Sequence, residues 1–77
     1  MNRTEIMRLR KYLNDKFETG KFELNPGNQK DGSMELHFGG EFIGVIYRDE
    51  DEGEISYALN IAILEEDLPT ASDASLI

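Results

Sequence analysis

The spacing of apolar residues changes once along this chain, at Gly20. Before that glycine, apolar residues recur every three or four positions, which predicts an amphipathic helix over residues 4–19. The apolar stripe consists of Ile6, Leu9, Leu13 and Phe17. After the glycine, apolar and polar residues alternate, as they do in strands with one buried face. The chain is therefore predicted to form one helix followed by a sheet.

Residues at both ends of the helical segment favour this interpretation. Asn2 and Glu5 have the spacing of a capping box, in which each side chain bonds the backbone N–H of the other residue. Thr4 is an alternative N-cap. Gly20 is placed to end the helix, because glycine adopts the left-handed conformation that is common at the C′ position.

Four later stretches alternate in the manner of strands. They cover residues 21–24, 33–38, 41–48 and 55–63. A polar loop is expected over 26–32, a two-residue hairpin turn at Gly39-Gly40 and an acidic turn over 49–53. Residues 57–68 are also rich in helix formers, so a second helix there is an alternative. We favour a strand because the alternation continues to Ile63.

The short connections favour antiparallel pairing of neighbouring strands. The predicted fold class is therefore α+β, with an N-terminal helix packed on a four-stranded antiparallel β-meander. A chain of 77 residues forms one domain, which we place at residues 1–68. Residues 69–77 carry little apolar surface and are expected to be a disordered tail. Without cysteine, apolar burial must hold the fold together, with or without help from self-association.

The third predicted strand has more apolar residues than one face of a sheet accommodates. Strict alternation directs Ile43, Val45 and Tyr47 to the face opposite Phe42 and Ile46. One helix covers only one face. We therefore expect the other face to contact a second copy of the chain, the C-terminal segment or an outside partner. The alternative is that these side chains are simply half-exposed.

Five of the six residues from Asp49 to Glu54 are acidic. Clustered carboxylates suit Ca²⁺ or Mg²⁺, and the candidate ligands are Asp49, Asp51 and Glu54. The spacing does not match an EF-hand loop, because the positions that require glycine and the last glutamate hold Glu54 and Asn60. The alternative is a solvated turn. We assign no metal and no cofactor.

The formal net charge of −8 disfavours nucleic acid and anionic membranes as partners. Six of the eight basic residues nevertheless lie within the first 21 residues. They indicate either an RNA-binding face on the helix or cations that offset the acidic remainder of the chain. No apolar stretch is long enough for a membrane helix or a signal-peptide core, so a cytoplasmic location is expected.

Catalytic motifs are not evident in the sequence. Alternation directs the single histidine, His37, outward, and no serine lies in a G-x-S-x-G context. Carboxylates on an exposed turn lack the enclosed pocket that acid–base catalysis needs. We do not expect an enzyme.

The segment GGEFIGVIYRDEDEGEISYALNIAILEEDL, residues 39–68, resembles a small bacterial family found mainly in alphaproteobacteria. The opening TEIMRLRKYLNDKF and the strand that ends at Phe38 also match, so the resemblance covers roughly residues 4–68. Its most specific part is the EFIGV strand leading into RDEDEG. The family is classed as a domain of unknown function, so the resemblance implies no catalytic residue, cofactor or partner.

The function expected from these patterns is that of a small non-enzymatic protein-interaction module of a bacterial cytosol. It would act on an unknown protein partner or as a homodimer. The expected interaction surface consists of Ile43, Val45, Tyr47, Asp49, Glu50, Asp51 and Glu52. The alternatives are divalent-ion or small-ligand binding at residues 49–54, and association with RNA through the basic helix.

Overall fold

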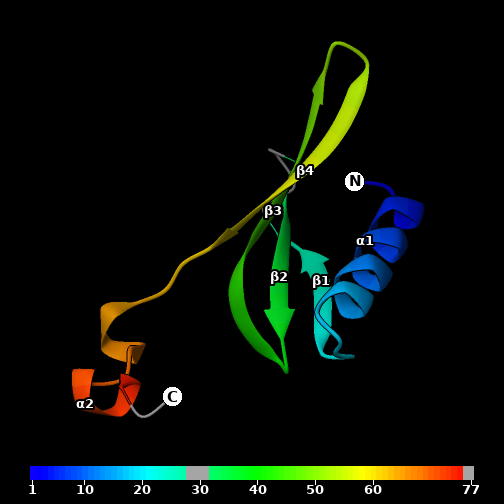
Figure 1. The fold of residues 1–77 in the computed structure, drawn as a ribbon. Helices are drawn as coiled ribbons and strands as arrows, with labels where there is room; N and C mark the ends of the chain where they lie inside the picture. The colour runs from blue at the N-terminus through cyan, green and yellow to red at the C-terminus, as the bar shows by residue number, and fades with distance from the viewer. Residues whose placement is uncertain (28–31, 76–77) are drawn as a thin grey trace.

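A computed structural model describes residues 1–27 and 32–75 and places a helix beside a four-stranded sheet (Figure 1). The elements are α1 (Arg3–Lys16), β1 (Phe22–Pro26), β2 (Met34–Phe38), β3 (Glu41–Asp51), β4 (Glu54–Ile61), the 3₁₀ helix η2 (Glu65–Asp67) and α2 (Ala71–Ala74). The strand order is β1-β2-β3-β4, and all neighbours are antiparallel. The predicted α+β meander is confirmed. Residues 28–31 of the expected loop and 76–77 of the expected tail lie outside the described residues.

The start of α1 confirms the predicted capping box. The Glu5 backbone N–H donates to Asn2 Oδ1 at 2.8 Å, and the Asn2 backbone N–H donates to Glu5 Oε1 at 3.1 Å. These bonds satisfy two N–H groups that the first turn of a helix leaves unpaired. Asn2, and not Thr4, is the N-cap.

The end of α1 differs from the prediction. The helix ends at Lys16, and Glu18 rather than Gly20 takes the left-handed conformation, with φ of 52°. The Thr19 N–H then donates to the Asn14 carbonyl at 2.9 Å, as in a Schellman motif. Because this bond satisfies a carbonyl of the last turn, the helix needs no glycine at its end.

Two short turns connect the last three strands. Gly39 and Gly40 have φ of 60° and 86°, which confirms the predicted two-residue hairpin turn. Glu52 and Gly53 have φ of 51° and 82° and form the second turn in the same way. β3 therefore continues to Asp51 before the chain reverses. The prediction of an acidic turn over 49–53 is wrong, because its first three residues extend β3 and pair with β4.

The alternatives for residues 57–68 are resolved in favour of a strand. β4 continues to Ile61 and pairs with β3 along its length, so no α-helix forms there. The strand ends two residues earlier than expected. The last residue pair between β3 and β4 joins Gly44 to Ile61. The residue of β3 before Gly44 is Ile43, where the pairing of β3 with β2 is irregular.

The register between β2 and β3 shifts once. Leu36 pairs with Gly44, whereas the next residue, His37, pairs with Phe42. Ile43 is thus an extra residue in β3, which is the definition of a β-bulge. A bulge reverses the alternation of side chains beyond it.

This bulge overturns the predicted faces of β3. Ile43 packs against the core instead of sharing the outer face with Val45 and Tyr47. Phe42 takes its place on that outer face, where its ring lies 5.6 Å from the ring of His37. The outer face keeps apolar side chains, but one of the three predicted residues is not among them.

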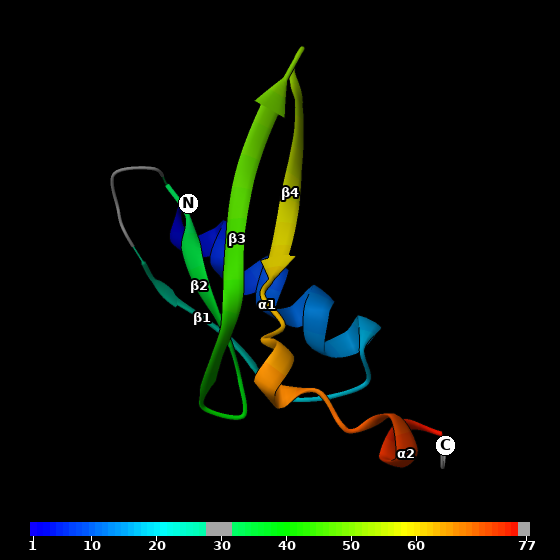
Figure 2. The same cartoon turned by 90° about the vertical axis from the view of Figure 1, so that its left-hand side faces the viewer.

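The core lies between α1 and the middle of the sheet, because α1 crosses one face of the strands (Figure 2). Its buried residues are Leu13, Phe22, Leu24, Met34, Leu36 and Ile46. Leu36 and Ile46 have no exposed surface. The Asn14 side chain bonds both backbone groups of Phe22, at 2.8 and 3.2 Å, and so fixes α1 against β1.

The molecule is elongated for its size. Its extents are 47, 25 and 24 Å, and its radius of gyration is 14.9 Å. A compact chain of this length has a radius of gyration of about 11.5 Å. The tip of the β3–β4 hairpin and the C-terminal segment lie at opposite ends (Figure 1), and every described residue after Leu59 is exposed. We call residues 62–68 the C-terminal arm. The boundary predicted at residue 68 and the disorder predicted beyond it stay predictions.

Within residues 1–27 and 32–75, no helix combines the length and the apolar character needed to cross a membrane.

The backbones of β3 and β4 approach too closely at Gly44 for a side chain. A Cβ atom there would collide with the Asn60 carbonyl and lie 3.0 Å from the Ile61 Cα atom. We predict that Gly44→Ala lowers the free energy of unfolding by about 1–3 kcal/mol, because the strands must move apart. Urea denaturation followed by circular dichroism measures this change. Gly20→Ala is the matched control, since nothing lies within 4 Å of a Cβ atom there. Equal stability of the two variants would contradict the close approach.

Candidate functional site

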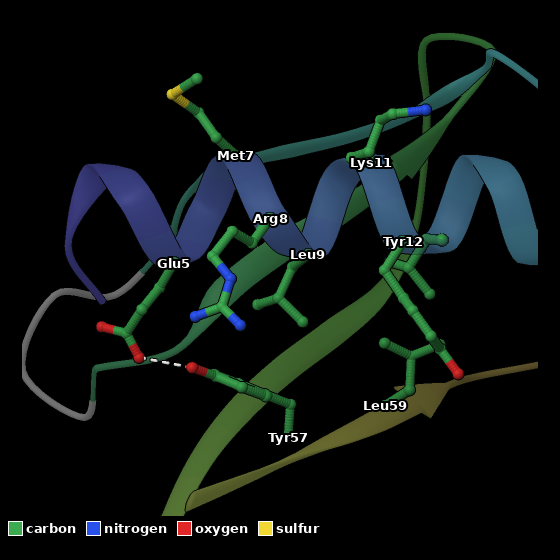
Figure 3. A pocket seen from close by; sticks show the side chains of 9 residues that line it. Glu5, Met7, Arg8, Leu9, Lys11, Tyr12, Tyr57 and Leu59 are labelled. Atoms are coloured by element: carbon green, nitrogen blue, oxygen red, sulfur yellow. Dashed lines mark hydrogen bonds between the residues drawn. The ribbon is translucent and has the colours of Figure 1, made fainter.

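An open groove separates α1 from β4 (Figure 3). Its volume is about 930 Å³. Most of its lining residues belong to α1, and the remainder come from the helix-facing side of β4. In Figure 3, Glu5, Arg8, Leu9 and Tyr12 point toward β4, whereas Met7 and Lys11 project from the other side of the helix. The lining residues are Glu5, Met7, Arg8, Leu9, Lys11, Tyr12, Leu13, Tyr57 and Leu59.

The groove forms because α1 does not cover the whole width of the sheet. The helix packs most closely on β1, at the opposite edge from β4. Leu59 pairs with Ile46 across the sheet, so its side chain faces the helix layer, as that of Tyr57 does two residues earlier. Both side chains are only half-buried, which leaves an apolar floor next to the helix.

The walls of the groove are apolar and exposed. Tyr12 points toward β4 in Figure 3 and leaves 58% of its surface in contact with water. Leu9 lies on the same side of the helix and is half-buried against the core. Met7 leaves 62% of its surface exposed and borders the groove from the other side of the helix. Side chains of this kind, gathered at a concave surface, are typical of a place where another molecule binds.

The rim of the groove is cationic. Among the described residues, Arg8 forms no ion pair. Lys11 pairs with Asp15 of the same helix at 2.8 Å, where water screens both groups. Arg8 therefore remains available to an acidic group that enters the groove.

Glu5 joins three elements at one end of the groove (Figure 3 shows its contact with Tyr57). Its Oε2 atom accepts hydrogen bonds from the Tyr57 hydroxyl at 2.6 Å and from Arg48 Nε at 2.8 Å. The Tyr57 hydrogen bond, then the Asn2 backbone N–H, then Arg48 lower the pKa of Glu5 from 4.5 to about 2. The same carboxylate raises the pKa of the Tyr57 hydroxyl and of Arg48.

The predicted apolar interaction surface is only partly assembled. Val45 is half-buried and Tyr47 is exposed on the outer face, where Phe42 joins them. His37 lies on the same face with its Nε2 atom 3.0 Å from Glu35 Oε1. This surface lies on the opposite side of the sheet from the groove.

The predicted acidic residues are divided between the two faces of the hairpin. Arg48 Nη2 lies 3.1 Å from Glu50 Oε1, on the helix side of β3. Alternation sends Asp49 and Asp51 to the other side, and Glu52 lies in the turn. In the part of the chain that the structure describes, no group of three or more His, Cys, Asp or Glu side chains could hold a metal ion.

The basic helix face is partly neutralised within the chain. Arg10 Nη2 lies 3.0 Å from Glu23 Oε1 on β1, and Lys11 pairs with Asp15. These pairs favour the interpretation that the helix cations offset acidic residues of the same molecule. They leave fewer free cations for a polyanion such as RNA.

The sequence did not single out the groove residues. Met7 and Tyr12 are apolar residues of α1 that lie outside the stripe of Ile6, Leu9 and Leu13. Tyr12 extends this stripe toward β4, which is a signal that the apolar face of the helix is wider than the part that the sheet buries. Tyr57 and Leu59 were identified as strand residues, but nothing in the sequence brings β4 next to α1.

We predict that the contribution of Glu5 to stability depends on pH. Because its pKa is lower in the folded than in the unfolded chain, the contribution is complete above pH 4.5 and is lost as the pH falls toward about 2. Glu5→Gln should therefore be less stable than the wild type above pH 4.5, and the two free energies of unfolding should converge near pH 2. Urea denaturation across this range measures the difference.

Glu50→Gln is the matched control for this experiment. It removes an exposed carboxylate from the same Arg48 but touches neither α1 nor Tyr57. It should leave the stability close to that of the wild type. A gap between the wild type and Glu5→Gln that is constant with pH would contradict the assignment.

Comparisons with known proteins agree with the resemblance to a family of unknown function. No curated protein and no solved structure matches this chain. A family model described as a protein of unknown function, DUF3126, matches residues 5–67. The match includes α1 from Glu5 onward, the four strands and η2, and therefore every residue that lines the groove. Since it spans most of the sequence, the chain belongs to the DUF3126 family of proteins of unknown function.

Proposed function

We propose that this chain is a small non-enzymatic protein-interaction module and that the α1–β4 groove is its recognition surface. The observation that carries the proposal is the exposed Tyr12 above the half-buried Leu59, next to Arg8, which forms no ion pair within the described residues. We place the module in the bacterial cytoplasm, because the sequence resemblance implies a bacterial source and a cysteine-free chain is compatible with a reducing compartment.

The chemistry of the groove defines the kind of segment that it would bind. Apolar walls favour Leu, Ile or Phe side chains of a partner, as in other grooves that bind peptides. Arg8, which points toward β4 in Figure 3, favours Asp or Glu next to those apolar residues. The partner would therefore present a short segment with two or three apolar residues flanked by acidic ones.

The titratable groups of the groove favour binding over catalysis. Glu5 is the carboxylate among the lining residues, and its pKa of about 2 keeps it ionised at neutral pH. Its acceptor atoms are already engaged by Tyr57, Arg48 and the Asn2 backbone. A general acid or base needs a pKa closer to the working pH and a free position for the substrate.

Selection from a random peptide library displayed on phage tests the proposed function. The full chain is immobilised sparsely, so that neighbouring molecules do not contact each other. We predict enrichment of peptides that combine apolar and acidic residues. Arg8→Glu with Tyr12→Asp should reduce the binding of the selected peptides at least about tenfold, because both a cation and an apolar wall are lost.

Tyr47→Lys is the matched control, because it changes an exposed aromatic residue on the outer face of the sheet. It should leave the binding of the selected peptides unchanged. Absence of enrichment would contradict the proposal. Binding that survives the groove changes but is lost with Tyr47→Lys would move the interaction surface to the outer face.

A further inference from the structure

The C-terminal arm exposes large apolar side chains. Ile63, Leu64 and Leu68 leave 73%, 54% and 55% of their surface in water. Soluble monomers rarely expose several large apolar residues side by side unless the surface binds something. The family match extends to residue 67, so most of the arm lies within the part of the chain that the family model covers.

The backbone of the arm leads it away from the body of its own molecule. Leu64 and Leu68 are extended, with ψ of 138° and 144°, and η2 lies between them. The chain therefore continues outward from the end of β4, on the side away from α1 (Figure 1). In this conformation the arm does not reach the groove of its own chain.

The arm and the groove are complementary in charge and in character. Glu65, Glu66 and Asp67 lie between the apolar residues of the arm, and no basic residue follows Arg48 in the sequence. α1 has five basic and two acidic residues, and Arg8 has no ion pair within the described residues. The arm thus has the composition that the groove would select, apolar residues flanked by acidic ones.

We propose that two copies of the chain exchange arms, so that residues 63–68 of each copy lie in the α1–β4 groove of the other. This inference rests on the proposed function of the groove and names a second copy as its occupant. Leu64 and Leu68 would contact Tyr12 and Leu59, and the acidic residues between them would face Arg8. Because the contact is reciprocal, it closes into a two-fold dimer and does not continue into a filament.

The molar mass in solution tests the exchange. Light scattering after size exclusion, over a tenfold range of concentration, should give twice 8.8 kDa for the full chain. Leu64→Asp with Leu68→Asp should give 8.8 kDa and an unchanged circular dichroism spectrum, because both side chains are exposed in the single chain. Tyr47→Lys should remain a dimer.

A charge exchange tests the contact between the arm and the groove directly. Arg8→Glu should raise the dissociation constant of the dimer at least about tenfold, because it places like charges together. Adding Glu65→Lys and Glu66→Lys to the same chain should restore dimer formation, since each contact again joins opposite charges. Failure of this rescue, with the chain still folded, would overturn the proposed contact.

Crosslinking distinguishes exchange from an arm that folds back onto its own chain. The protein has no cysteine, so Tyr12→Cys and Leu64→Cys each introduce a single thiol. A short bismaleimide should crosslink a mixture of the two variants into a covalent dimer and should leave each variant alone as single chains. A chain with both changes that crosslinks within itself, and not to a second copy, would overturn the exchange.

The remaining outcomes separate this inference from the proposed function. A mass of 8.8 kDa at all concentrations overturns the exchange. A dimer that survives the arm changes but is lost with Tyr47→Lys also overturns it, because the contact then lies on the outer face. If selected peptides bind the groove of a monomeric chain, the proposed function stands and only the identity of the occupant is wrong.

Discussion

The burial of Leu36 and Ile46 beneath α1 is the contact on which the rest of the structure depends. These residues lie in the two central strands, β2 and β3, and have no exposed surface. A small chain without disulfides has little else to offset the conformational entropy lost on folding. The hairpin tip and the C-terminal arm extend beyond this core, so the surfaces available for binding lie at its margins.

Glu5 determines how the margin nearest to α1 is shaped. Its carboxylate has enough acceptor positions to cap the helix and to hold Arg48 of β3 and Tyr57 of β4 at the same time. These contacts hold the helix next to β3 and β4 in the chain alone. A groove held in this way loses less entropy on binding than one formed by free side chains.

The helix and the strands could be predicted because their periods are visible along the sequence. The Gly39-Gly40 turn could be predicted because two adjacent glycines suit a turn with positive φ at both positions. The acidic residues 49–54 led to a wrong prediction of where β3 ends, because five carboxylates suggest a solvated turn. A hairpin whose two faces are both exposed accommodates these carboxylates equally well. At the end of α1, backbone hydrogen bonds allow Glu18 to take the role expected of Gly20.

The candidate site was harder to predict than the fold. Met7 and Tyr12 were visible as apolar helix residues, but Tyr57 and Leu59 join them only through the packing of the sheet. The α1–β4 groove combines residues about fifty positions apart, and periodicity does not report such contacts. The sequence-based surface failed at Ile43 for a different reason, since one irregular pair moves that residue to the core.

The bulge at Ile43 also affects how this chain should be aligned with other members of its family. The bulge reverses which residues of β3 face the core. Up to residue 43 the odd-numbered residues face it, and from residue 44 onward the even-numbered residues do, as Ile43 and Ile46 illustrate. A homologue that lacks one residue at the position of Ile43 could keep the same fold and yet direct a different set of side chains outward. Within the family, a single-residue gap here would therefore change the outer surface of the sheet more than several substitutions elsewhere.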